Sequence, residues 1–190
     1  MSEVVKSALE KYINLNEDEW QTVLSKWDFV EYKKNEFLLK EGQIEHYFYI
    51  MNDGVVRLYF ENNNEDVCLG FSFNHSWSGG YDSFVTQKPS KFFLQALSEA
   101  SMFRISYQNL QQLYEEVPKM ERFGRLILEE LITARTVREV EMMSMDTEER
   151  YNIFMSRSAH LLQLIPQKHI ASYLRMTPET FSRLRAKIGQ

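Results

Sequence analysis

The sequence has a single cysteine, Cys68, among its 190 residues. One thiol cannot form an intramolecular disulfide, and it excludes an all-cysteine iron–sulfur cluster or zinc cage, because these need several thiolates. Long apolar runs are missing as well: no stretch reaches the roughly 18 apolar residues of a membrane-spanning helix, and the charged N-terminus is unlike a signal peptide. These absences predict a soluble, cytoplasmic protein that does not contact a membrane.

Recognisable enzyme motifs are missing too. The sequence contains no cluster of metal ligands and no nucleophile–base motif, so we expect neither an enzyme nor a bound metal or cofactor. Haem binding by His46 or His75 has no supporting motif. Cys68 lies in a strand-like pattern, which predicts a buried and unreactive thiol.

Acidic residues are scarce near the C-terminus. Residues 151–190 contain six Lys or Arg and one acid, Glu179, which gives this segment a net charge of +5. Residues 1–150 carry −10, and the whole chain carries −5. So sharp a division predicts two modules with different partners, and the positive module favours a phosphate-rich partner such as DNA.

Short runs of β-branched and aromatic residues fill the segment from about residue 29 to residue 106. Turn signals rich in Gly and Asn separate these runs, which predicts a β-sandwich or a small barrel. Asp53-Gly54 stands between two apolar runs and is predicted to be a hairpin turn. A short helix over residues 2–13 and a second helix capped by Asn16 are expected before the strands.

An amphipathic helix is predicted from Pro118 to about residue 145. Its apolar stripe contains Met120, Phe123, Ile127 and Leu131, and continues towards Met142. Two interpretations stay open: the helix packs on its own domain, or it pairs with a second copy and joins the two modules.

Residues 167–188 have the spacing of a helix-turn-helix, because apolar residues at helical spacing can form one small core between two helices. These residues include Ile170, Leu174, Phe181 and Leu184. Thr177 suits a helix N-cap and Pro178 the first helical position. On a helical wheel, Glu179, Ser182 and Arg183 face away from the apolar side of the second helix. A carboxylate, a hydroxyl and a guanidinium at the N-terminal end of such a helix have the chemistry of major-groove readout.

Contacts to the DNA backbone are expected from residues around this face. Thr177 and Thr180 would lie near phosphate at the helix N-terminus. The cationic candidates are Lys168, Arg185 and Lys187, with His169 as a further one. An ordinary helical hairpin with a solvated, charged face is the competing interpretation of the same spacing.

The segment IASYLRMTPETFSRLRAKI, at residues 170–188, closely resembles the helix-turn-helix of the Crp/Fnr family of bacterial transcription regulators. The family's order is a cyclic-nucleotide-binding-like barrel, a long dimerisation helix and a DNA-binding winged helix, and the same order is expected here. The barrel segment 36–59 has the family's glycines at Gly42 and Gly54. The resemblance puts Glu179 and Arg183 at base-contacting positions and Thr180 at a backbone-contacting one.

The resemblance also implies partners: a palindromic double-stranded DNA operator, a second copy of the chain in a homodimer, and RNA polymerase as a candidate. The sequence departs from the family at Arg175, which replaces the usual turn glycine, and at Pro178, which replaces an arginine. The segment between residues 161 and 169 is short for a wing.

Nucleotide-binding members hold the cyclic phosphate with a Gly-Glu pair and an Arg followed by a small hydroxyl residue. The corresponding stretch here, residues 79–97, matches at Gly80 only. The candidate ligand-binding residues are therefore Gly80, Tyr81, Asp82, Ser90 and Lys91. Three interpretations stay open: cyclic AMP binding in the family's usual way, an apolar or aromatic pocket for an unknown small-molecule effector, and an empty, structural barrel.

The fold class is therefore predicted as α+β. A double-stranded β-helix or jelly-roll barrel occupies residues 1–117, a dimerisation and linker helix 118–145, and a winged-helix-like helix-turn-helix domain 146–190. The predicted function is sequence-specific transcription regulation of the Crp/Fnr type that does not use cyclic AMP in the usual way. The alternative is an effector-binding or interaction protein that has lost its DNA-binding function.

Overall fold

The computed structural model describes residues 2–188. Two helices come first, α1 (Ser2–Glu10) and α2 (Glu17–Leu24). A capping box opens α2: the Asn16 side chain accepts a hydrogen bond from the Glu19 N–H, and the Glu19 carboxylate accepts one from the Asn16 N–H. The predicted cap is thus confirmed.

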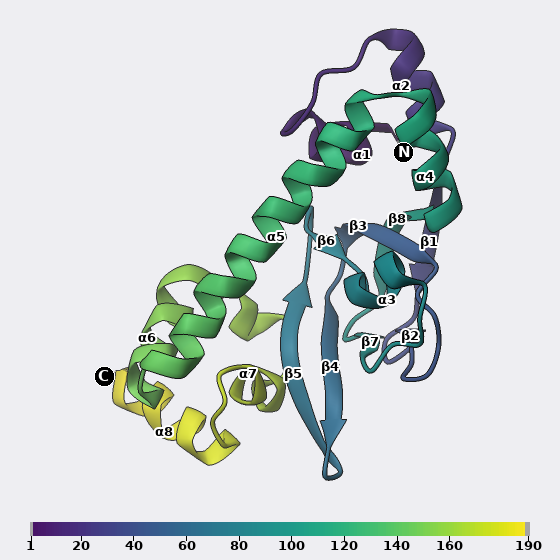
Figure 1. The fold of residues 1–190 in the computed structure, drawn as a ribbon. Helices are drawn as coiled ribbons and strands as arrows, with labels where there is room; N and C mark the ends of the chain where they lie inside the picture. Colours follow the sequence, from purple (N-terminus) through teal and green to yellow (C-terminus); the bar gives the residue numbers. More distant parts are fainter. Residues whose placement is uncertain (1, 189–190) are drawn as a thin grey trace.

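Eight strands follow and form two four-stranded antiparallel sheets (Figure 1). The strand order is β1-β8-β3-β6 in one sheet and β2-β7-β4-β5 in the other, which is the arrangement of a jelly roll. The predicted barrel is therefore confirmed. The strands are β1 (Trp27–Tyr32), β2 (Phe37–Leu39), β3 (Tyr47–Asp53), β4 (Val56–Asn62), β5 (Glu65–Ser72), β6 (Trp77–Ser78), β7 (Phe93–Ala96) and β8 (Ala100–Ser106).

The Asp53-Gly54 turn does not close a hairpin, and this prediction was wrong. The turn joins β3 to β4, which belong to different sheets. Gly54 has φ +89°, and a Cβ added there would lie 2.4 Å from the Glu99 carbonyl oxygen. The hairpin lies at the next turn, where Asn63 and Asn64 both have positive φ and connect β4 directly to β5.

Helices cover one face of the β1-β8-β3-β6 sheet. They are α3 (Tyr81–Thr86), α4 (Tyr107–Glu116) and α5 (Lys119–Ser144), together with α1 and α2. Their apolar side chains share a core with Trp27, Phe48 and Ile105 of the sheet. A separate core fills the space between the two sheets, where Leu39, Tyr49 and Met102 are almost completely buried.

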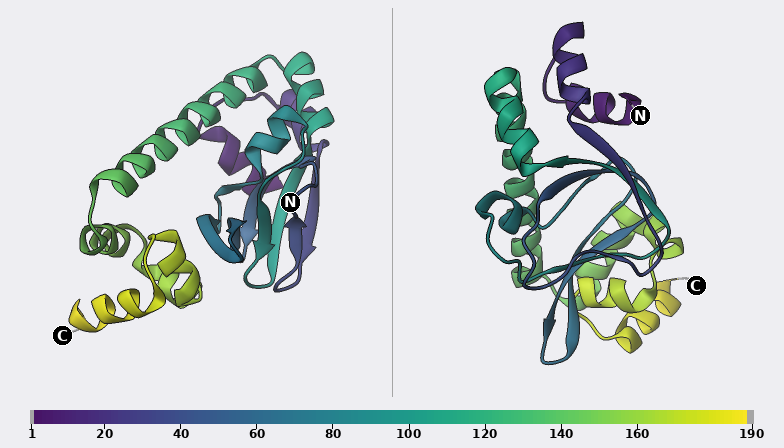
Figure 2. Two further views of the ribbon diagram at one scale, coloured as in Figure 1. Left: turned by 60° about the horizontal axis from the view of Figure 1, so that its bottom comes forward. Right: turned by 90° about the vertical axis from the view of Figure 1, so that its right-hand side faces the viewer.

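The long helix α5 agrees closely with the predicted bounds and runs from the barrel to the C-terminal helices (Figures 1 and 2). Met120, Phe123 and Ile127 are buried against the N-terminal core, so this half of the helix does pack on its own domain. In the second half Ile132 and Met143 are exposed. Within residues 2–188 no helix combines the length and the apolarity that crossing a membrane requires.

The described C-terminal part consists of helices and the short turns that join them. It contains α6 (Thr147–Ser158), the 3-10 helix η1 (Ala159–Gln163), α7 (Gln167–Tyr173) and α8 (Pro178–Ile188). Asp146 caps α6 through a second capping box with Glu149. Because residues 146–188 form no β-strand, the winged part of the predicted fold is wrong for this segment; the short chain between α6 and α7 folds as a 3-10 turn instead.

Candidate nucleic-acid interface

The helix pair α7–α8 is joined by a tight turn centred on Arg175. Arg175 has φ +56°, in the left-handed region. Its N–H donates to the Ser172 carbonyl and the Met176 N–H donates to the Ala171 carbonyl, which is the Schellman pattern of a helix C-terminus. The tight turn expected between the two helices is thus formed without glycine, at a cost of about 1 kcal/mol for the arginine backbone.

Packing fixes the orientation of α8. Phe181 and Leu184 are buried against Ile170, Ala171 and Leu174, as the apolar spacing predicted. At the start of the helix, the Thr177 hydroxyl accepts a hydrogen bond from the Thr180 N–H at 3.2 Å, which is the predicted N-cap.

The opposite face of α8 gathers the predicted base-reading residues. Glu179, Ser182 and Arg183 are exposed and line one shallow hollow together with Pro178 and Ala186. A hydrogen bond from its own backbone N–H, and then one from the Thr177 hydroxyl, lower the pKa of Glu179. This carboxylate is therefore ionised at neutral pH and can act as an acceptor.

The side chains predicted to contact phosphate differ in how exposed they are and in whether another residue already pairs with them. Arg185 is exposed, whereas Lys187 forms an ion pair with Glu148 at 2.9 Å. His169 is only 8% exposed and lies 3.1 Å from the Arg57 guanidinium. Burial, and then Arg57, lower the pKa of His169 to about 4. His169 is therefore neutral at pH 7, and its burial leaves little of its ring for the phosphate contact that the sequence suggested.

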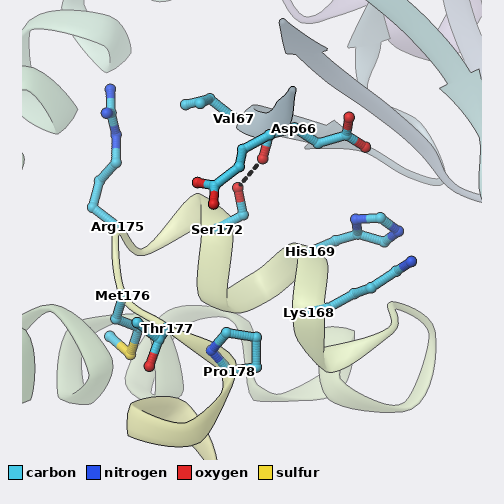
Figure 3. Close-up of a pocket in the computed structure, with 10 residues that line it drawn as sticks. Asp66, Val67, Lys168, His169, Ser172, Arg175, Met176, Thr177 and Pro178 are labelled. Carbon is cyan, nitrogen blue, oxygen red and sulfur yellow. Dashed lines mark hydrogen bonds between the residues drawn. The ribbon is translucent and has the colours of Figure 1, made fainter. Parts of the chain in front are cut away.

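The barrel provides a platform for α7 (Figures 1 and 3). The Ser172 hydroxyl donates to the Asp66 carbonyl at 2.8 Å and accepts from the Cys68 N–H at 3.0 Å. Arg57 is buried and forms an ion pair with Asp66 at 2.7 Å. The β4–β5 hairpin is thereby attached to α7, a contact that no pattern in the sequence indicated.

A hollow of about 690 Å³ lies beside this contact. Figure 3 shows Lys168, Arg175 and Thr177 around it, together with Asp66 of the hairpin. Glu65 lines the same hollow. The acidic hairpin therefore shares this space with Lys168 and Thr177, which the sequence assigns to the DNA backbone.

A second hollow, of about 280 Å³, lies between the barrel and α5. Of the five predicted ligand-binding residues, Tyr81 and Asp82 line it. The other three do not: Gly80 packs against Leu39, the Ser90 hydroxyl accepts from the Phe92 N–H, and Lys91 is exposed.

The α5 hollow also includes residues that the sequence analysis missed. Its wall contains Phe48 and Trp77 from the sheet, and Ile132 and Arg135 from α5. Arg135 comes from a helix about 50 residues after Asp82, so sequence proximity gave no signal for this cation.

Cys68 is buried, as predicted, and burial raises the pKa of its thiol to about 12. The thiol is therefore unreactive at neutral pH. His46 and His75 are both exposed. Over residues 2–188 no three His, Cys, Asp or Glu side chains are grouped in a way that could hold a metal ion.

Residues 29–117 match the family model of the cyclic nucleotide-binding domain. No curated protein sequence matches the chain. Three solved structures are similar. A CooA mutant from Carboxydothermus hydrogenoformans has a TM-score of 0.70 and 18% identity, and the match covers 88% of this chain and 78% of that one. The c-di-GMP-responsive regulator CLP of Xanthomonas campestris has a TM-score of 0.68 and 16% identity, with 92% of each chain covered; the Thermus thermophilus catabolite activator protein has a TM-score of 0.60 and 17% identity, with 96% of this chain and 86% of that one covered. At these identities the likeness is one of fold.

Proposed function

We propose that this chain, which contains a cyclic nucleotide-binding domain at residues 29–117 and has the fold of Crp/Fnr-family regulators, is a sequence-specific DNA-binding transcription regulator. One observation carries the proposal. The N-terminal half of α8 presents Glu179, Ser182 and Arg183 on one solvent-facing side, while its opposite side is buried.

The chemistry of this face matches the edges of base pairs in the major groove. The Arg183 guanidinium can donate two hydrogen bonds to guanine, and the Glu179 carboxylate can accept one from the cytosine amine. Thr177 and Thr180 lie at the N-terminus of α8, where backbone N–H groups favour phosphate. The charge of +5 on residues 151–190 supplies attraction that does not depend on sequence.

The second half of α5 supports action as a homodimer. Leu128, Ile132, Val140 and Met143 are 37–79% exposed and lie within about 120° on a helical wheel. A second copy of α5 would remove these side chains from water. Two α8 helices, about 34 Å apart, would then read the halves of a palindrome.

The α5 hollow supports an effector other than cyclic AMP bound in the family's usual way. Tyr81 replaces the expected glutamate, and no arginine stands beside Ser90. The walls are mainly aromatic and aliphatic, with Asp82 and Arg135 as the charged side chains. A largely apolar molecule fits such a wall better than a cyclic phosphate, which needs an arginine guanidinium that can bind two phosphate oxygens at once.

The alternative function is an effector-binding or interaction protein that no longer reads DNA. One observation favours it: Glu65 and Asp66 share a hollow with Lys168, Arg175 and Thr177. Two carboxylates in this hollow would repel the phosphates of a DNA backbone there, unless the hairpin separates from α7 when DNA binds.

Selection of genomic DNA fragments by the purified protein, followed by binding titrations at several salt concentrations, tests the proposal. We expect a palindrome to be enriched and the affinity for it to fall steeply with salt. Arg183→Ala should weaken specific binding by about 1–3 kcal/mol and relax the choice at one base pair.

The matched control is Arg122→Ala, which removes an exposed arginine from α5, far along the chain from α8. This variant should bind the selected DNA like the wild type. Unchanged specific affinity in Arg183→Ala would show that α8 does not dock as proposed. Failure to enrich any sequence, with or without extracts of small molecules, would favour the alternative function.

A further inference from the structure

A third hollow, of about 480 Å³, is lined by residues of β1, β2, β3 and β8 and of the connection between β2 and β3, and it is separate from the α5 hollow. Tyr47 and Tyr49 line it from β3, whereas Phe48, on the opposite face of the same strand, lines the α5 hollow. The two hollows share no residue. The remaining wall residues are Tyr32, Leu38, Leu39, Gln43, Ile44, Glu45, His46 and Arg104.

Arg104 is the notable group in this hollow because its guanidinium lacks an anionic partner. No Asp or Glu among residues 2–188 forms an ion pair with it within 4.0 Å. Its Nε is buried and has no acceptor within the same residues. The guanidinium lies over the Tyr47 ring, 4.0 Å from the ring centroid. Buried N–H donors are rarely left without an acceptor, so this geometry favours an acceptor that comes from a ligand.

Two tyrosine hydroxyls add to the polar end of the hollow. Burial raises the pKa of Tyr32; the Tyr49 hydroxyl and the Arg104 guanidinium oppose this rise, and Glu45 adds to it. The Tyr49 hydroxyl donates to the Glu45 carboxylate at 3.3 Å. The hydroxyl proton of Tyr49 is therefore already used in a hydrogen bond to Glu45. The Tyr32 hydroxyl stays protonated at neutral pH and can donate a hydrogen bond to a ligand beside Arg104.

The rest of the wall is part polar and part apolar. Gln43, Glu45 and His46 are its polar side chains, and the Glu45 carboxylate already accepts hydrogen bonds from the Tyr47 N–H, the Tyr49 hydroxyl and the Gly80 N–H. Leu38 and Ile44 are half-buried there, and Leu39 is buried. A single guanidinium among such side chains suits a monoanion with a flat apolar body. A phosphate dianion would need further cations to replace its hydration.

We propose that this hollow binds a small aromatic carboxylate, held by the Arg104 guanidinium and the Tyr32 hydroxyl, with its ring against Tyr47 and Leu38. The proposal gives the barrel a ligand site of defined chemistry outside the α5 hollow. It does not depend on whether the protein binds DNA.

Isothermal titration calorimetry of the full chain with benzoate tests the site, with neutral benzamide as the matched ligand. We expect saturable binding of benzoate and at least about tenfold weaker binding of benzamide, because only the carboxylate makes charge-assisted hydrogen bonds. Arg104→Gln should weaken benzoate binding by about tenfold or more. Arg135→Gln, in the α5 hollow, should leave it unchanged.

The comparison of the two ligands uses the wild-type protein, so it stands even if Arg104→Gln does not fold. Absence of saturable benzoate binding would overturn the proposal, and so would equal affinity for benzamide. Benzoate binding that survives Arg104→Gln but is lost in Arg135→Gln would assign the ligand to the α5 hollow and would also overturn it.

Discussion

The buried carboxyl of Glu45 gives the protein a stability that depends on pH near neutrality. Its side chain is 2% exposed and accepts hydrogen bonds from the Tyr47 N–H at 3.0 Å, the Tyr49 hydroxyl at 3.3 Å and the Gly80 N–H at 3.4 Å. Burial, which these hydrogen bonds only partly offset, raises the pKa of Glu45 from its usual 4.5 to about 7. Glu45→Gln keeps the shape of the side chain and removes the titration.

The sign of the effect follows from proton binding. Since the pKa is higher in the folded chain, the folded state holds a proton on Glu45 between about pH 4.5 and pH 7 that the unfolded state has lost. This contribution to stability is complete below pH 4.5 and is lost as the pH rises through 7. A pKa difference of one unit between the folded and unfolded states corresponds to about 1.4 kcal/mol. The rise from 4.5 to about 7 therefore changes the free energy of unfolding by about 3 kcal/mol.

Urea unfolding followed by tryptophan fluorescence measures this change, because Trp20, Trp27 and Trp77 all lie in or against the N-terminal core. Between pH 4.5 and pH 8 the wild type should lose about 3 kcal/mol more stability than Glu45→Gln. Glu31→Gln, at an exposed position of β1, is the control and should follow the wild type. Parallel pH dependences for the wild type and Glu45→Gln would refute the reasoning.

Three further changes test other parts of the structure. Gly54→Ala should destabilise the barrel by at least about 1 kcal/mol, because its φ of +89° and the nearby Glu99 carbonyl leave no room for a Cβ; an unchanged urea midpoint would contradict this. Arg175→Gly should stabilise the chain by up to about 1 kcal/mol by relieving the left-handed arginine, and a lower stability would show that the guanidinium makes a favourable contact. In analytical ultracentrifugation the wild type should sediment as the proposed dimer and Ile132→Glu as a monomer with unchanged helical circular dichroism; a monomeric wild type would contradict the dimer, and a dimer that persists in Ile132→Glu would remove α5 from the interface.

Local patterns allowed much of the fold to be predicted. The capping box at Asn16 and the apolar spacing of Ile170, Phe181 and Leu184 depend on residues a few positions apart, and both were confirmed. Strand composition likewise indicated a β-barrel. Turn chemistry, however, shows where the chain bends and not which strand pairs with which, so Asp53-Gly54 was assigned to a hairpin although it links two sheets.

The grouping of the candidate site residues could be predicted where they lie on one helix, and it could not where the residues come from distant segments. Glu179 and Arg183 share a face because of helical periodicity alone. Ser172 and Asp66 are 106 positions apart, so no pattern in the sequence indicated their hydrogen bond. The same holds for Arg135 in the α5 hollow and for the pairing of Lys187 with Glu148.

The attachment of α7 to the β4–β5 hairpin has a consequence for how the chain folds as it is made. Synthesis proceeds from the N-terminus at about 5–20 residues per second, and domains fold as units in that order. The last strand of the jelly roll ends at Ser106, whereas α7 begins at Gln167. We therefore expect the hairpin to be folded before α7 leaves the ribosome, so that the hydrogen bonds of Asp66 and Cys68 with Ser172 fix the position of α7 last.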